Sequence, residues 1–238
     1  MPVSINHALL TDLYQLTMAQ GYLECGKGQT QACFHMSFRD YPFKGGYAIA
    51  SGMAHLADLV EGFRFSDEDL AYLASVPAPG GGALFKQSFL DYLRDFRLSV
   101  DIDAVREGTA VFPNEPIVRV VGPIMECQML ETALLNCVSF ETLIATKAAR
   151  ICLAAQAPVA EFGLRRAQGP AGGVWASRAA VVGGCASTSN VMAGKLFGIP
   201  VSGTHAHSWV MAFPDELTAF RAYAEQFPKN RSEEHTSE

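Results

Sequence analysis

Hydrophobic residues spaced three and four positions apart predict helices along the first two thirds of the chain. In residues 9–22, for example, Leu9, Leu13 and Leu16 fall on one face of a helix. A later helix has a capping sequence that begins at Ser66, with an acidic residue three positions further on. These patterns predict helices at residues 9–22, 51–63, 66–75, 85–96 and 125–155, and leave open a break in the last one near 137–139.

Alternating apolar and polar positions predict strands between these helices. Residues 31–38 alternate around Phe34 and Met36, which is typical of a half-buried strand. Residues 98–121 contain short β-branched runs interrupted by glycine and proline, which indicates small antiparallel strands joined by tight turns. The glycine-rich residues 77–83 are predicted to form a turn.

Beyond Pro158 the pattern changes to short strands that alternate with helical segments. Strands are predicted at residues 159–163 and 199–202, and helices at 173–182 and 188–196, the second of them capped within 187–189. This alternation indicates βαβ units in a parallel sheet or barrel. Such folds bind ligands at the carboxyl ends of their strands, so the residues at those ends are the candidates for function.

Composition narrows the class of protein. The 238 residues are 49% hydrophobic and have a net charge of −6, which excludes intrinsic disorder and argues against a nucleic-acid partner. The first residues lack the pattern of a signal peptide, and no apolar run reaches the roughly 18 residues of a membrane helix. The six cysteines form no C-x-x-C pair, so we expect reduced, mostly buried thiols in a cytoplasmic protein without a membrane partner.

Two predicted strand ends contain residues suited to binding anions. Arg165 and Arg166 follow the strand at 159–163, and their planar donor groups suit a carboxylate or phosphate, although a surface ion pair is an equal alternative. The glycines and hydroxyl residues before the helix at 188–196 either cap that helix or bind an anion. These phosphate-binding candidates are Ser187, Thr188, Ser189 and Asn190.

The sequence Gly-Thr-His-Ala-His at 203–207 follows the last predicted strand. Two histidines at this spacing would suit a metal pair, but the further ligands such a site needs are scarce, and we expect no protein-built metal site. His205 then has a structural role. His207, at a predicted helix start, is a candidate nucleophile or general acid–base.

These motifs together resemble the nicotinate phosphoribosyltransferases, a type II phosphoribosyltransferase family. Six segments match in the family's order across nearly all of residues 1–230. They are TDLYQLTM at 11–18, EGTAVFPNEPIVRVVGP at 107–123, TLIATKAARI at 142–151, EFGLRRAQGP at 161–170, TSNVMAG at 188–194 and FGIPVSGTHAHSW at 197–209.

The resemblance implies roles for individual residues. His207 resembles the histidine that ATP phosphorylates during turnover, and Thr204 resembles a nicotinate contact. Phe162 resembles one face of an aromatic sandwich around the pyridine ring, and Tyr14 the other, reaching in from a partner subunit of a homodimer. Arg165 resembles the arginine that holds a phosphate or carboxylate beside the ring.

The implied reaction converts nicotinate, phosphoribosyl pyrophosphate and ATP to nicotinate mononucleotide, pyrophosphate, ADP and phosphate, with Mg²⁺ bridging the phosphates. Alternatives are a related nicotinamide or quinolinate phosphoribosyltransferase, or a catalytically incomplete fragment of the enzyme. The family's chains are longer, so we expect a C-terminally truncated chain. The implied fold is an N-terminal α+β domain at 1–124, the first part of an irregular (β/α) barrel at 125–230, and a non-family tail at 231–238.

Overall fold

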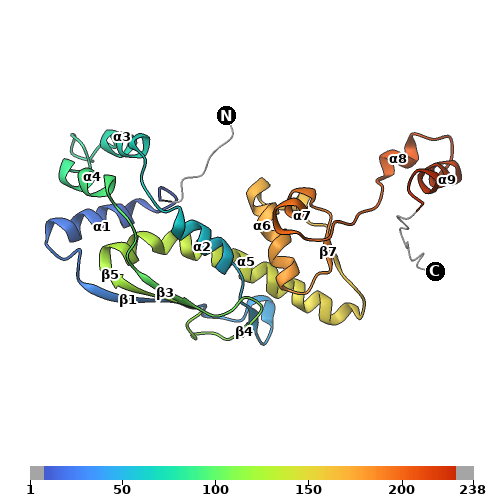
Figure 1. Cartoon of the computed structure of the whole chain (residues 1–238), viewed down its shortest axis with the longest axis horizontal. Coiled ribbons are helices and arrows are strands. Elements are labelled where there is room, and N and C mark those ends of the chain that lie inside the picture. Colours follow the sequence, from blue (N-terminus) through green and yellow to red (C-terminus); the bar gives the residue numbers. More distant parts are fainter. Residues whose placement is uncertain (1–7, 229–238) are drawn as a thin grey trace.

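The computed structural model describes residues 8–228, which form two packed parts joined by one long helix, with the last two helices standing apart from the second part (Figure 1). The predicted tail at 231–238 lies outside the described residues. The N-terminal part contains a small antiparallel sheet and four short helices, and the C-terminal part contains short parallel strands and helices. This is the predicted order of an α+β part followed by the beginning of an α/β part.

The N-terminal sheet has three strands in the order β1-β5-β3. β1 (Gln31–Met36) and β3 (Asp101–Ala104) both pair antiparallel with β5 (Val118–Pro123), so that Val121 lies between Cys33 and Asp101. A second antiparallel pair joins β2 (Ala48–Ile49) to β4 (Ala110–Val111). The small strands predicted between 98 and 121 are therefore confirmed.

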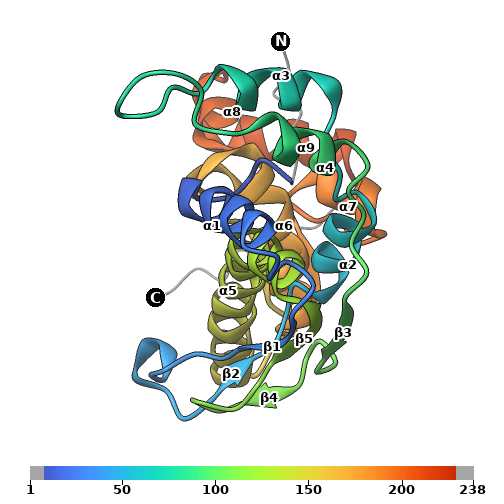
Figure 2. The ribbon, with the colours of Figure 1, turned by 90° about the vertical axis from the view of Figure 1, so that its left-hand side faces the viewer.

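α1 and α2 pack against α5, which itself contacts β1 and β5 of the sheet, whereas α3 and α4 pack against each other (Figure 2). Their bounds are α1 (Leu13–Glu24), the short 3-10 turn η1 (Pro42–Lys44), α2 (Met53–Glu61), α3 (Asp67–Ser75), α4 (Gln87–Arg94) and α5 (Ile124–Ala155). The predicted cap at Ser66 is confirmed, because its hydroxyl accepts a hydrogen bond from the Asp69 amide and the Asp69 carboxylate accepts one from the Ser66 amide. The first helix begins at Leu13 rather than at residue 9.

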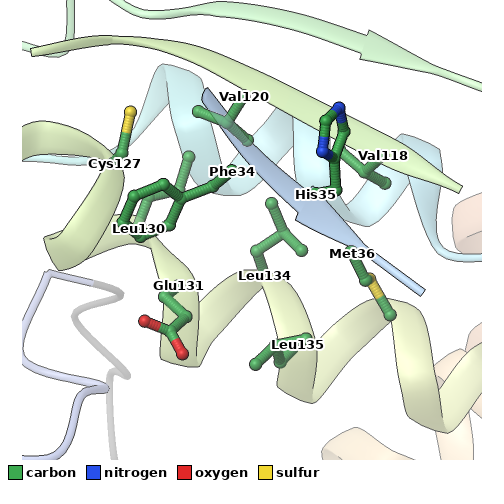
Figure 3. Close-up of a pocket in the computed structure, with 10 residues that line it drawn as sticks. All are labelled: Phe34, His35, Met36, Val118, Val120, Cys127, Leu130, Glu131, Leu134 and Leu135. Carbon is green, nitrogen blue, oxygen red and sulfur yellow. The ribbon is translucent and has the colours of Figure 1, made fainter. Parts of the chain in front are cut away.

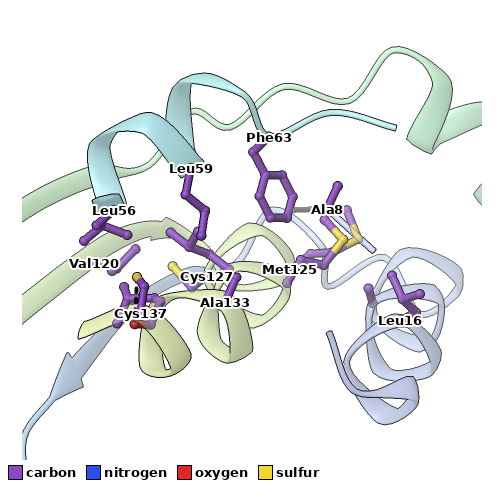
Figure 4. Packing of buried hydrophobic residues seen from close by; sticks show 14 of the residues in the cluster. Ala8, Leu16, Leu56, Leu59, Phe63, Val120, Met125, Cys127, Ala133 and Cys137 are labelled. Carbon is purple, nitrogen blue, oxygen red and sulfur yellow. Dashed lines mark hydrogen bonds between the residues drawn. The ribbon is translucent and has the colours of Figure 1, made fainter. Parts of the chain in front are cut away.

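The N-terminal core lies between these helices and the sheet. Figure 4 shows Leu56 and Leu59 of α2 above Cys127 and Ala133 of α5, and all four side chains are buried. Burial of apolar side chains of this size stabilises the fold by about 1.5–3 kcal/mol for each large residue.

α5 is continuous over 32 residues, so the break that the sequence left open near 137–139 does not occur. Its first half belongs to the N-terminal core, which extends to Val138. Its second half contributes Ala148 to a smaller buried cluster with Ala180 and Cys185 of the C-terminal part. Residues 124–155 contain no proline or glycine, and the helix has packing partners along both halves, so it has no physical cause to kink.

The C-terminal part begins with two short parallel strands. β6 pairs with β7, and a single bridge adds Val201 beside Thr188, where the sequence predicted a longer strand at 199–202. The elements are β6 (Ala160–Glu161), the 3-10 turn η2 (Leu164–Arg166), α6 (Gly169–Val182), β7 (Ser187–Thr188), α7 (Val191–Phe197), α8 (His207–Met211) and α9 (Glu216–Gln226). Within residues 8–228 the parallel strands thus form only the start of a barrel.

The prediction of a helix at 188–196 was wrong at its beginning. Ser187 and Thr188 form β7, and the helix starts at Val191 with Asn190 as its cap. The reason is that both residues bond to neighbouring segments: Thr188 pairs with Glu161 of β6, and Ser187 Oγ lies 2.6 Å from Ser202 Oγ. In the part of the chain that the structure describes, no helix is both long and apolar enough to cross a membrane.

Candidate functional site

A cavity of about 510 Å³ opens beyond the ends of β6 and β7. Its wall combines the segment after β6, the residue after β7 and the loop that leads into α8. The lining residues are Phe162, Leu164, Arg165, Ser189, Gly203, Thr204, His205, Ala206 and His207. The structure therefore brings together five predicted site residues: Phe162, Arg165, Ser189, Thr204 and His207.

Glu161 fixes the two strand ends that form one wall of the cavity. Its Oε2 accepts a hydrogen bond of 2.6 Å from Thr188 Oγ1, and its Oε1 accepts one from the Gly163 amide. Its main-chain carbonyl accepts a hydrogen bond of 2.9 Å from the Ser189 amide. Phe162 and Ser189, which line the cavity next to these bonds, are thus held by both backbone and side-chain contacts.

The two predicted arginines lie in η2 but face different cavities. Arg165 lines the cavity described above, whereas Arg166 lines a neighbouring one of about 270 Å³ beside Phe140 of α5. η2 can lie this close to α6 because Gly173 has no side chain, since a Cβ there would come 2.7 Å from Leu164 Cδ1. The geometry favours Arg165 over Arg166 as a partner for an anion in the larger cavity.

The four phosphate-binding candidates have different surroundings. Thr188 and Asn190 are buried and their side chains bond to groups of this chain: Asn190 Oδ1 accepts from the Ala193 amide, and its Nδ2 donates to Gly173 O at 3.2 Å. Ser187 contacts another serine, as described above. Ser189 is the only one of the four that lines the cavity, so it is the one placed to meet a ligand there.

His207 and His205 also line the cavity, in and before the first turn of α8. His207 is exposed. The His205 ring lies 5.4 Å from the ring of Phe220 and 5.0 Å from that of Tyr223, both on α9. His205 thus joins the loop to α9, as expected of a structural histidine.

Tyr14 is not near the cavity of its own chain. It lies on α1 in the N-terminal part, is 49% exposed, and its hydroxyl accepts a hydrogen bond of 2.9 Å from Gln15 Nε2 (Figure 1). Burial and the nearby Glu131 and Asp12 raise the pKa of Tyr14, so the phenol stays protonated. Within one chain, Tyr14 and Phe162 do not form a sandwich.

A third cavity, of about 230 Å³, lies between the sheet and α5 (Figure 3). Its walls are mainly apolar side chains such as Phe34, Leu130 and Leu134, with His35 and Glu131 as polar residues. Within residues 8–228, no group of three or more His, Cys, Asp or Glu side chains is placed to hold a metal ion.

Sequence reasoning missed two features of the site. Leu164 lines the cavity between Phe162 and Arg165, and only its place in the same motif could have indicated this. The second is an ion-pair cluster behind the cavity, in which Arg178 of α6 binds Glu107. These two residues are 71 positions apart, and no local pattern in the sequence connects them.

Comparisons with known proteins agree with this geometry. Residues 9–139 match the profile of the nicotinate phosphoribosyltransferase (NAPRTase) N-terminal domain. The chain is 47% identical to nicotinate phosphoribosyltransferase of Bacillus subtilis over 219 residues, which cover 92% of this chain and 44% of that relative. It is 45% identical to the human nicotinate phosphoribosyltransferase over 220 residues, 89% of this chain and 40% of the human one.

Solved structures are similar as well. The crystal structure of human nicotinic acid phosphoribosyltransferase superposes with a TM-score of 0.78 at 44% identity and covers 85% of this chain and 40% of its own. A nicotinate-nucleotide pyrophosphorylase from Pyrococcus furiosus has a TM-score of 0.74 at 25% identity, covering 94% and 50%. The chain thus spans about half the length of these proteins or less. It belongs to the nicotinate phosphoribosyltransferase family.

Proposed function

We propose that this chain provides the nicotinate-binding and phosphate-accepting part of a nicotinate phosphoribosyltransferase. The observation that supports this most is the cavity at the strand ends, where an aromatic ring and a guanidinium group from one segment and a histidine from another line one space. Nicotinate is a flat ring with one carboxylate, and phosphoribosyl pyrophosphate and ATP contain several phosphates. An aromatic face and cationic groups match these ligands.

In the transfer step, the pyridine nitrogen attacks the anomeric carbon of the phosphoribosyl group as its bond to pyrophosphate breaks. The sugar gains positive charge in the transition state, so catalysis depends mainly on orienting the ring and on holding the negative groups. In this proposal Phe162 stacks on the pyridine ring, Thr204 contacts nicotinate, and Arg165 binds its carboxylate or a phosphate. Ser189 offers its hydroxyl group to the ligand, because its amide already donates a hydrogen bond to the Glu161 carbonyl.

His207 is the proposed nucleophile towards ATP. An imidazole nitrogen attacks the γ-phosphorus, a P–N bond forms, and ADP leaves; water later breaks that bond and releases phosphate. The exposure of His207 on the cavity wall supports this role, since ATP needs access to the ring.

Tyr14 acts in this proposal through a second copy of the chain. Tyr14 is exposed on α1 and does not line the cavity of its own chain, so stacking on the pyridine would require the site of a partner chain. This supports the proposal of a homodimer with a shared site. The pairing is testable by mixing Tyr14→Ala and His207→Ala versions of the chimera described below, because only mixed dimers would contain one intact site.

The proposal also covers Mg²⁺ and the cellular location of the protein. The described residues supply no cluster of metal ligands, so Mg²⁺ would arrive on the phosphates of the substrates rather than in a protein-built site. The cysteines at 25, 33, 127, 137, 152 and 185 are free. We place the protein in the cytoplasm on the sequence alone, since six cysteines without a C-x-x-C pair are typical of reduced thiols.

The test uses a chimera that joins residues 1–228 to the part of the Bacillus subtilis relative that this chain does not cover. We expect pyrophosphate release that depends on nicotinate, and its loss in Phe162→Ala and Arg165→Ala. His35→Ala, on β1 outside this cavity, is the matched control and should keep full activity. Turnover with nicotinamide or quinolinate in place of nicotinate would contradict the proposed substrate.

A further inference from the structure

An ion-pair cluster connects the two parts of the molecule behind the cavity. Arg178 of α6 donates two hydrogen bonds to Glu107, which lies between β3 and β4: Nη1 to Oε1 at 2.9 Å and Nη2 to Oε2 at 2.6 Å. Its Nη1 also lies 3.6 Å from Oε2 of Glu141 on α5. The Arg178 and Glu107 side chains are only 19% and 20% exposed, and that of Glu141 is fully buried.

Glu107 is itself fixed to the N-terminal part. Its Oε1 accepts hydrogen bonds of 2.8 and 2.9 Å from the amides of Gly52 and Met53, at the start of α2. Gly52 lies so close to α5 that a Cβ there would come 2.9 Å from the Val138 Cα. Arg178 therefore binds a carboxylate that is fixed to the N-terminal part. The bond between Arg178 and Glu107 thus holds α6 in place relative to α2 and α5.

A stacked pair next to the cluster holds the preceding turn of α6. The Trp175 ring lies 3.8 Å from the His55 ring of α2 at an interplanar angle of 8°, and His55 Nδ1 lies 2.9 Å from Glu141 Oε1. Trp175 and Arg178 are three residues apart, so both lie on one face of α6. This face is attached to the N-terminal part.

The other face of α6 contacts the two segments that form the cavity wall. Gly173 O and Ser177 Oγ accept hydrogen bonds from Asn190 Nδ2 at 3.2 and 3.1 Å. Leu164, next to Arg165, packs over Gly173. A displacement of α6 would therefore move both the segment that contains Arg165 and the segment that contains Ser189.

We propose that Arg178 is a positioning residue for this cavity: its bidentate bond to Glu107 sets α6, and α6 sets the segments that present Arg165 and Ser189. This inference rests on the proposed function only because it takes this cavity as the ligand site. The positions of the segments that carry Arg165 and Ser189 are a property of the protein without ligand. It can be measured with no ligand present, so its test is independent of whether the cavity binds nicotinate.

The geometry requires arginine in particular. The guanidinium group forms two parallel bonds to one carboxylate, whereas a lysine ammonium at this position can form only one of them. Arg178→Lys keeps the charge and most of the side-chain length, so it removes the bidentate geometry with little other change. Arg94→Lys on α4 is the matched control, because Arg94 is half exposed and bonds only to Asp91 one turn earlier.

The test is amide hydrogen exchange of the 238-residue chain, in the wild type and both lysine variants. In Arg178→Lys we expect the amides of Ser189 and Arg166 to exchange at least about tenfold faster, the factor that loss of one charge-assisted hydrogen bond gives for a local opening. The ladder amides between β1 and β5 should be unchanged, and Arg94→Lys should change neither set. Unchanged exchange at Ser189 and Arg166, or an equal increase in the β1–β5 ladder, would overturn the proposal.

Trp175 gives a second, spectroscopic measurement. In a Trp209→Phe background it is the only tryptophan, and its emission reports the stack on His55. We expect Arg178→Lys to shift this emission and Arg94→Lys to leave it unchanged. Glu107→Gln, which keeps an oxygen for the α2 amides, should shift it in the same direction. Identical spectra for all variants would show that Arg178 does not set α6.

Discussion

Asn190→Ala should destabilise the C-terminal part by about 3 kcal/mol, because its side chain is buried and makes three hydrogen bonds. Loss of the cap on α7 costs about 1 kcal/mol. The two bonds from Nδ2 to Gly173 O and Ser177 Oγ add about 1 kcal/mol each. Ser177 still donates to Gly173 O, so that carbonyl keeps a partner.

Urea unfolding followed by circular dichroism measures this free energy. Ser66→Ala is the control for a helix cap, since the Ser66 hydroxyl accepts a hydrogen bond from the Asp69 amide and donates one to the Asp69 carboxylate at the start of α3, and we expect about 1 kcal/mol for it. Asn190→Ser keeps a capping oxygen but no amide donors, so it should lose about 2 kcal/mol. If Asn190→Ala costs no more than Ser66→Ala, the Asn190 amide is not part of the folded framework and the phosphate-binding alternative gains weight.

Three further predictions follow from the packing, the charges and the length of the chain. Gly183→Ala should destabilise the fold by about 3 kcal/mol or more, because a Cβ there would overlap the Ala145 carbonyl oxygen and lie 2.7 Å from Ala148 Cβ. Thermal unfolding measures this, and an unchanged melting temperature would contradict the close approach of α5 and α6. Burial tends to raise the pKa of Glu107, but the bonds and charge of Arg178 hold it below 4.5. Its stabilisation is therefore present above that pH and disappears as the pH falls through the lowered pKa, so unfolding free energy should decrease in acid more steeply in the wild type than in Glu107→Gln. The 238-residue chain alone should release no pyrophosphate in a nicotinate-dependent assay, because its parallel strands make only the start of a barrel; turnover by purified chain would refute this.

Much of the site was predictable because its residues sit in local motifs. Phe162 and Arg165 lie in one short segment after a predicted strand, and Thr204 and His207 in another. Parallel strands end at the same edge of a sheet, so placing both strands was enough to bring these segments together. The assignment of ligands to each residue came from the family resemblance, and it stays a prediction.

What the sequence could not predict depends on contacts between distant segments. The sequence left open a break in α5 near 137–139, yet just beyond that point the hydroxyl groups of Thr142 and Thr146 accept hydrogen bonds from the backbone amides of Ser51 and Ile49, beside and in β2. These hydrogen bonds satisfy buried hydroxyl groups on a straight helix. The spacing of hydrophobic residues in the sequence does not predict them. The division at residue 124 also stays a prediction, since α5 contributes to both buried clusters.

The most direct test of the central claim is to map phosphate from ATP onto the chain. The chimera is incubated with γ-labelled ATP, and the acid-labile, base-stable label is located by mass spectrometry in the wild type, His207→Ala and the control His35→Ala. We predict label on His207 in the wild type and the control, and none in His207→Ala. Label that persists in His207→Ala, or maps to another residue, would contradict the assignment of this cavity as the site where ATP is coupled to phosphoribosyl transfer.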